Sequence, residues 1–77
     1  MTVNVILFGA LIDAAGTNKT EVKDVADCDS LKSKLLIDYP ELNNYKFLMA
    51  VHNQVVKGNL KLNEGDTIAL LPPFAGG

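Results

Sequence analysis

The sequence predicts an α+β fold in which one main helix packs on one face of a mixed sheet of four or five strands. Its 77 residues are enough for a single domain. Apolar runs near both ends, residues 3–9 and 67–71, have the composition of strands. Between them lies one amphipathic segment of about three helical turns, with no second helix of comparable length. Residues 1–71 are therefore expected to form the domain, and residues 72–77 an extended, flexible tail.

The first predicted strand, Val3 to Gly9, carries apolar residues on both of its faces. Such a strand is expected in the interior of a sheet, covered at least partly on each side. Residues 11–15 fit a loop or one helical turn, and residues 16–18 fit a turn. From Lys19 to Val25 charged and apolar residues alternate, which predicts an edge strand paired with the first one as a hairpin.

The main helix is predicted to begin in the segment Asp27 to Ser30, because these short polar side chains suit an N-cap. Leu31, Leu35 and Tyr39 follow at four-residue spacing and form its apolar stripe. Pro40 ends the helix, since the residue before a proline avoids helical backbone angles.

The chain after the helix is predicted to form three strands joined by turns. They are Phe47 to Val51, a possible short return strand from Gln54 to Val56 after a turn at His52-Asn53, and Thr67 to Leu71. Leu42, Leu60 and Leu62 are expected to anchor the connections. The first and last strands are the most apolar, so we place them side by side at the centre. This arrangement is the β-grasp, or ubiquitin-like, fold.

The composition excludes several function classes. The net charge is −2, the seven lysines are scattered and arginine is absent, so we expect no nucleic-acid partner. No apolar run approaches the length of a membrane span, so we expect no membrane partner. The single cysteine, Cys28, allows neither an internal disulfide nor a cysteine-based zinc site. With no signal peptide at the N-terminus, it fits the reducing cytoplasm.

The domain offers no catalytic constellation. His52 is the only histidine and is interpreted as an exposed turn residue, and Cys28 as an incidental thiol. Glu64 and Asp66 flank Gly65 in a turn and do not form a general acid–base pair. The remaining unusual group is the Gly77 carboxylate. It is a poor electrophile until it is activated, for example as a mixed anhydride with AMP. A thiol or persulfide could then replace AMP and leave a thiocarboxylate.

The tail suits that chemistry. Pro72 and Pro73 lack a backbone N–H, so they cannot continue a sheet ladder and are expected to direct the tail away from the domain. Gly76 and Gly77 have no Cβ, so this end of the chain could enter a narrow cleft. The alternative interpretation is an ordinary frayed terminus.

These features resemble the ubiquitin-like sulfur carriers and, in more detail, the small subunits of molybdopterin synthases. The resemblance covers essentially the whole chain. It is carried by Val5 to Phe8, Ala15-Gly16-Thr17, Tyr39-Pro40, Ala50-Val51 with Asn53, Gly65-Asp66 ahead of Ile68, and the terminal Pro72-Pro73-Phe74-Ala75-Gly76-Gly77. The chain departs from the family at His52, which is inserted in the usual Ala-Val-Asn stretch. It also departs at Ala14 and Ala15, where charge is common.

The resemblance implies a sulfur carrier in molybdenum cofactor biosynthesis. An ATP-dependent, E1-like activating enzyme would adenylate Gly77, and a sulfur donor protein would convert it to a thiocarboxylate. The chain itself would bind no cofactor and no metal. Its tail, Pro72 to Gly76, would thread into the active site of the large subunit. There two sulfurs, one per carrier, would pass to cyclic pyranopterin monophosphate and form the dithiolene of molybdopterin.

The resemblance also implies an assembly. The chain would not be an enzyme on its own but the sulfur-donating subunit of a sulfurtransferase, with two small and two large subunits. Phe8, Leu70, Leu71 and Phe74 are candidates for the docking surface. We favour core packing for Phe8 and Leu70. Phe74 is favoured as an interface anchor, because a tail aromatic has little of its own domain to pack against.

Three other functions stay open at this point. The chain could carry sulfur for thiamine thiazole or another sulfur-requiring product. It could be a protein modifier joined to lysines through Gly77, which would leave covalent conjugates in cell extracts. It could also be a β-grasp binding module with an inert tail, and truncation of the tail would then change nothing.

The position of Phe74 gives the first prediction. Phe74→Ala should weaken assembly with the large subunit and leave thermal stability nearly unchanged, because the ring is expected to anchor the interface and not the core. Binding measurements and thermal unfolding of the same variant check both parts. A large loss of stability with unaltered assembly would contradict the interface role.

Overall fold

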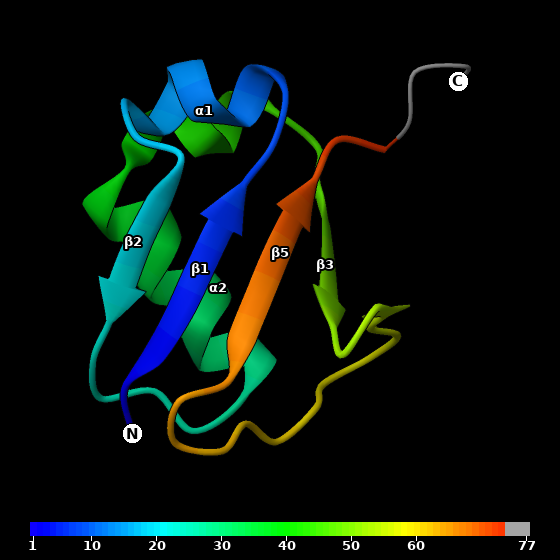
Figure 1. The fold of residues 1–77 in the computed structure, drawn as a ribbon. Helices are drawn as coiled ribbons and strands as arrows, with labels where there is room; N and C mark the ends of the chain where they lie inside the picture. The colour runs from blue at the N-terminus through cyan, green and yellow to red at the C-terminus, as the bar shows by residue number, and fades with distance from the viewer. Residues whose placement is uncertain (74–77) are drawn as a thin grey trace.

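The computed structural model describes residues 1–73 as a five-stranded mixed sheet with helices (Figure 1). In chain order the elements are β1 (Val3–Leu7), α1 (Ala10–Ala15), β2 (Lys19–Val22), α2 (Cys28–Asp38), the 3-10 helix η1 (Pro40–Asn44), β3 (Leu48–Val51), β4 (Gln54–Val55) and β5 (Thr67–Leu71). The strand order is β2-β1-β5-β3-β4. Figure 1 shows α2 crossing one face of the sheet, and α1 at the end where β1 and β5 finish. The predicted β-grasp fold is confirmed.

The two most apolar strands lie side by side at the centre, as predicted. β1 and β5 run parallel, with Val5 opposite Ile68 and Leu7 opposite Leu70. β2 pairs with β1, and β3 with β5, in antiparallel fashion. β2 and β3 are therefore parallel to each other on the two sides of the central pair, and the crossover that connects them contains α2 and lies on one face of the sheet.

The core lies between α2 and the inner face of the sheet. Val5, Leu7, Ile68 and Leu70 point inward from the two central strands and are fully or almost fully buried. They form one cluster with helix residues such as Leu35. The register explains this, because residues two apart along a strand share one face.

The connections are anchored in the core, with one exception. Leu42 in η1 and Leu62 ahead of β5 are buried, as predicted. Leu60 is 43% exposed, so its expected role as an anchor is wrong. Its backbone has a structural role instead, because its carbonyl accepts a hydrogen bond of 2.9 Å from the amide of Cys28 at the start of α2.

The start of α2 is fixed by a capping box. The Asp27 carboxylate accepts a 2.8 Å hydrogen bond from the Ser30 amide, and the Ser30 hydroxyl accepts one of 3.2 Å from the Asp27 amide. The bonds from Ser30 lower the pKa of Asp27, because they favour the ionised carboxylate. The contribution of this ionisation to stability is present above the pKa of the unfolded chain. It is lost as the pH falls through the lower pKa of the folded state.

Two turns show where local geometry ends a strand. β2 ends at Val22, earlier than predicted, because Asp24 adopts a left-handed φ of 62° that breaks the extended conformation. His52 and Asn53 have φ values of 53° and 65°. Two consecutive residues with positive φ are typical of a tight two-residue hairpin, which here joins β3 to β4.

Two residues of α2 provide a matched test of this core. Leu35→Ala should lower the free energy of unfolding by about 2–5 kcal/mol, because it removes a fully buried side chain and leaves a cavity. Ile37→Ala is the control, because Ile37 is 76% exposed and its loss should cost less than about 0.5 kcal/mol. Urea unfolding measures both values. Equal losses would mean that α2 is not packed as described.

Candidate functional site

The face of the sheet opposite α2 carries an apolar row that crosses four strands. The register places Ile6 of β1 opposite Ala69 of β5, Ala69 opposite Ala50 of β3, and Ala50 opposite Val55 of β4. Directly paired residues share one face of a sheet, so these four side chains form one row. Within the described residues, the helices lie elsewhere and leave this face open (Figure 1).

A second apolar row lies next to the first, at the end of the sheet where the tail begins. Leu48 of β3 pairs with Leu71 of β5. Phe8 lies beyond Leu71 on the far side of that strand, because its amide donates a 3.2 Å hydrogen bond to the carbonyl of Leu70. We call the two rows together the outer apolar face; it consists of Ile6, Phe8, Leu48, Ala50, Val55, Ala69 and Leu71.

The structure corrects one predicted residue and agrees with another. Phe8 is 44% exposed, so the core packing favoured from the sequence is wrong. Leu7 is buried, and successive side chains point to opposite faces, so Phe8 must point outward. Leu70 lies in the core, as expected, while Leu71 is half-buried on the outer face.

The outer apolar face is hollowed toward a polar end. A depression of about 450 Å³ is lined by apolar residues of β1, β3 and β5 and, beyond them, by His52, Asn53, Gly65, Asp66 and Thr67. His52 is 77% exposed, as predicted for a turn residue, and its Nε2 lies 3.8 Å from Oδ1 of Asp66. The second carboxylate oxygen of Asp66 accepts a 2.8 Å hydrogen bond from the Asn63 amide. The turn at residues 63–66 is therefore held by polar contacts of Asp66. Asp66 and His52 border the apolar part of the depression.

The point where the chain leaves the sheet is fixed by a close contact. Gly9, directly after Phe8, has φ of 60°, and a Cβ on it would lie 3.2 Å from Cγ of Pro72. Together with its ψ of −138°, this φ lies in a region that only glycine adopts without strain, and glycine also leaves this space to the proline ring. Pro72 and Pro73 are exposed and follow β5 directly. The other predicted tail residues, Phe74, Ala75, Gly76 and Gly77, lie outside the described residues.

The remaining groups considered from the sequence are the Cys28 thiol and the side chains that could bind a metal. Cys28 is buried at the first turn of α2, and burial raises the pKa of its thiol, which disfavours the reactive thiolate. This agrees with its interpretation as an incidental thiol. Across residues 1–73, no three histidine, cysteine or acidic side chains are grouped as metal ligands. In the same part of the chain, no helix has the length and apolar character needed to cross a bilayer.

Sequence reasoning missed part of the outer apolar face. Ile6, Leu48 and Val55 were not singled out, because an apolar residue in a strand with two apolar faces gives no sign of which face is covered. The available signal was the pairing itself: once Leu71 is placed outward, its cross-strand partner Leu48 must follow.

The comparison with known proteins identifies the family. Residues 5–77 match the model described as the ThiS family. The chain belongs to this family. The match includes residues 5–7 of β1 and all of β5 and reaches the terminal Gly76-Gly77, so it covers the outer apolar face and the tail together.

Individual relatives are consistent with this membership. The molybdopterin synthase sulfur carrier subunit of Mycobacterium tuberculosis is 32% identical over 80 residues, which cover 97% of this chain and 96% of that protein. A Pyrococcus furiosus protein, provisionally assigned as molybdopterin converting factor subunit 1, superposes with a TM-score of 0.87. It is 20% identical, and the match covers 96% of this chain and 99% of that one, so it supports the fold. The resemblance predicted from the sequence is confirmed.

A third relative was solved together with another protein. The structure is that of a complex of subunits 1 and 2 of the molybdopterin-converting factor from Helicobacter pylori. The matched chain superposes with a TM-score of 0.75 at 26% identity, and the match covers all of both chains.

Proposed function

We propose that this ThiS-family chain is the sulfur carrier subunit of a molybdopterin synthase, acting through a thiocarboxylate on Gly77. The observation that carries the proposal is the 32% identity to a sulfur carrier subunit of that enzyme, which extends over nearly the full length of both proteins. The terminal Pro-Pro-Phe-Ala-Gly-Gly of this chain supports it.

The proposed chemistry takes place on the tail. A carboxylate oxygen of Gly77 attacks the α-phosphorus of ATP in an activating enzyme and releases pyrophosphate. A donor persulfide then displaces AMP and forms an acyl disulfide. A second thiol cleaves that acyl disulfide, which releases the thiocarboxylate and leaves a disulfide on the donor. In the large subunit, the sulfur attacks a side-chain carbon of the pyranopterin and displaces an oxygen substituent from it, and water then cleaves the resulting thioester so that the sulfur stays on the pterin. The carrier carboxylate is restored, and two carriers complete the dithiolene.

The domain's part in this chemistry is to dock and to present the tail. An exposed aromatic residue among aliphatic ones, bordered by polar groups, has the composition of the core and rim of a protein interface. The outer apolar face includes Phe8 and Leu71, next to the start of the tail at Pro72. A partner bound to this face is therefore also placed to receive the tail. We propose that this partner is the large subunit, in an assembly of two small and two large subunits in the cytoplasm.

The division of labour fits the charges of the chain. It has no arginine and a net charge of −2, so it is poorly suited to hold a phosphorylated pterin or ATP. Those groups would be bound by the large subunit and by the activating enzyme. The chain would bind no cofactor and catalyse nothing alone.

A charge placed on the outer apolar face should separate docking from folding. Phe8→Asp should weaken binding to the large subunit at least about tenfold, because it puts an unpaired charge in an apolar interface. Ile37→Asp is the matched control, since it also replaces an exposed apolar side chain by a negative charge, but on α2. It should alter the dissociation constant less than about twofold. Titration calorimetry measures both constants, and thermal unfolding verifies that both variants fold. Equal effects would contradict docking through this face.

The carrier role itself is tested by intact mass. After incubation with ATP, a sulfur donor and the activating enzyme, the chain should gain the mass difference between sulfur and oxygen. Deletion of Gly77 should abolish that gain without unfolding the domain. Full loading of the truncated chain, or no loading of the intact chain by an enzyme active on a known carrier, would overturn the proposal.

The acceptor then separates the sulfur pathways. The loaded carrier, mixed with the large subunit and cyclic pyranopterin monophosphate, should return to its original mass as molybdopterin forms. A carrier that loads but keeps its sulfur in this mixture would belong to another pathway, such as thiamine thiazole synthesis. Covalent conjugates to lysines in extracts would indicate a protein modifier.

A further inference from the structure

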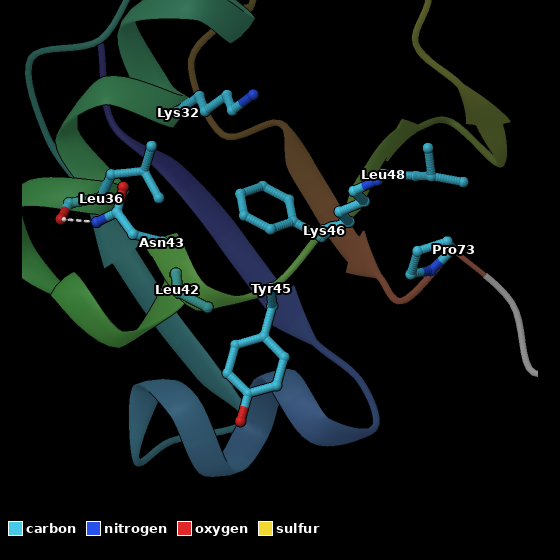
Figure 2. Close-up of a pocket in the computed structure, with 9 residues that line it drawn as sticks. Lys32, Leu36, Leu42, Asn43, Tyr45, Lys46, Leu48 and Pro73 are labelled. Atoms are coloured by element: carbon cyan, nitrogen blue, oxygen red, sulfur yellow. Dashed lines mark hydrogen bonds between the residues drawn. The ribbon is translucent and has the colours of Figure 1, made fainter.

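A second hollow, of about 510 Å³, lies beside the start of the tail (Figure 2). Its walls come from parts of the chain that are distant in sequence. They are Lys32 and Leu36 of α2, Leu42 and Asn43 of η1, residues 45–48 at and before the start of β3, and Pro73. Figure 2 shows Lys32 and Leu36 on one side of the hollow, and Leu48 and Pro73 on the other. Its volume is in the range of sites that hold a side chain or small ligand.

The hollow is apolar inside and built on a rigid frame. Leu42 is fully buried, and Tyr45 and Leu48 are exposed at the rim. The Asn43 side chain braces the wall, because its amide nitrogen donates to the carbonyls of Pro40, at 3.0 Å, and of Leu36, at 3.4 Å. An exposed apolar hollow with fixed walls is suited to accept an apolar side chain from another molecule.

The charges that line the hollow are of one sign. The hollow is lined by two lysines, Lys32 and Lys46, and by no aspartate or glutamate. The whole chain carries nine acidic residues and seven lysines. Lys32 is held at the rim, since its Nζ lies 5.8 Å from the centre of the Phe47 ring, within cation–π range. Among the residues that the structure describes, neither lysine is in an ion pair with a carboxylate. The rim would therefore attract an acidic group.

The hollow is continuous with the outer apolar face. Leu48 belongs to both surfaces, and Pro73, the last residue of the tail that the structure describes, forms part of the hollow. A protein that covers Phe8 and Leu71 also lies close to the hollow, because Leu48, the cross-strand partner of Leu71, lines it. The two surfaces can thus be covered by one partner.

We propose that this hollow is a second docking site for the large subunit, and that it takes an apolar side chain flanked by carboxylates. The apolar side chain would enter between Leu42 and Leu48, and the carboxylates would pair with Lys32 and Lys46. This inference rests on the proposed function, since it takes the large subunit as the partner. It adds the chemistry of the partner segment and an electrostatic contribution that the outer apolar face does not provide.

Reversing both charges at the hollow tests the electrostatic part. Lys32→Glu with Lys46→Glu should weaken binding to the large subunit of the same organism about tenfold or more at low salt, and less at high salt. The matched control is Lys23→Glu with Lys57→Glu, which changes the net charge equally at exposed lysines outside the hollow. The control should change the dissociation constant less than about threefold. Equal effects of the two double variants would overturn the proposal.

A photocrosslinker placed at the hollow tests the identity of the occupant. With p-benzoylphenylalanine in place of Tyr45, irradiation of the complex should link this chain to a large-subunit peptide that contains aspartate or glutamate. Lysine substitutions of those acids should then restore binding to the Lys32→Glu, Lys46→Glu variant. A link to a second copy of this chain, to residues 74–77 of its own tail, or to a partner peptide without acids would overturn the proposal.

The proposed function and this inference fail in distinguishable ways. If Phe8→Asp weakens binding but the double variant at the hollow behaves like its control, the docking site is wrong and the carrier role stands. If the intact chain neither binds the large subunit nor gains sulfur, both are wrong.

Discussion

The parallel pairing of β1 with β5 is the constraint on which the other features of this domain depend. Because the two strands run in the same direction, the chain needs a long crossover between them, and α2 lies on that crossover over one face. The other face keeps no cover from residues 1–73. The parallel arrangement also brings the ends of both strands to the same edge. Phe8 and Leu71 are therefore close to each other and to Pro72, where the tail begins.

This arrangement leaves Phe8, Leu48 and Val55 exposed on one face, which would favour aggregation if the strands at the edges were also open. The β2 edge carries Lys19 and Glu21, both exposed, which oppose pairing with another sheet. At the other edge, β4 has only two residues and ends in a turn region. Of the outer apolar face, only Val55 lies on an edge strand, and that strand is too short to offer a long pairing edge. A surface protected in this way is typical of a docking site and not of an incomplete core.

The elements of the fold could be predicted from the sequence because their signals are local. Polar capping groups at Asp27 and Ser30, a four-residue apolar repeat and Pro40 define α2 without reference to the rest of the chain. The assignment of Phe8 could not be made in this way. A strand that is apolar on both faces looks the same whether its second face is covered by the chain itself or by a partner. Only the register with β5 shows which residues point outward.

The site divides in a similar way. The chemistry of the tail was proposed from its last six residues, because proline and diglycine restrict what that segment can do. The hollow beside β3 had no local signal, since its walls come from α2, η1, the segment that leads into β3, β3 itself and Pro73. Lys32 and Lys46 are 14 positions apart and resemble the other scattered lysines until the fold places them on one rim. Sites assembled from several elements in this way become visible only in three dimensions.

A carrier that is loaded by one enzyme and unloaded by another must bind both and be released from both. A wholly apolar interface would serve this poorly, because additional buried area would slow dissociation from each partner equally. Charges at the rim act mainly on the rate of association and on the choice of partner, and they are screened by salt. Under the proposed function, the outer apolar face could be common to both enzymes, whereas Lys32 and Lys46 would favour the one with an acidic segment at the right place. Under the same proposal, the outer apolar face and the hollow, which share Leu48, would give one small domain a common contact and a discriminating one beside the same tail.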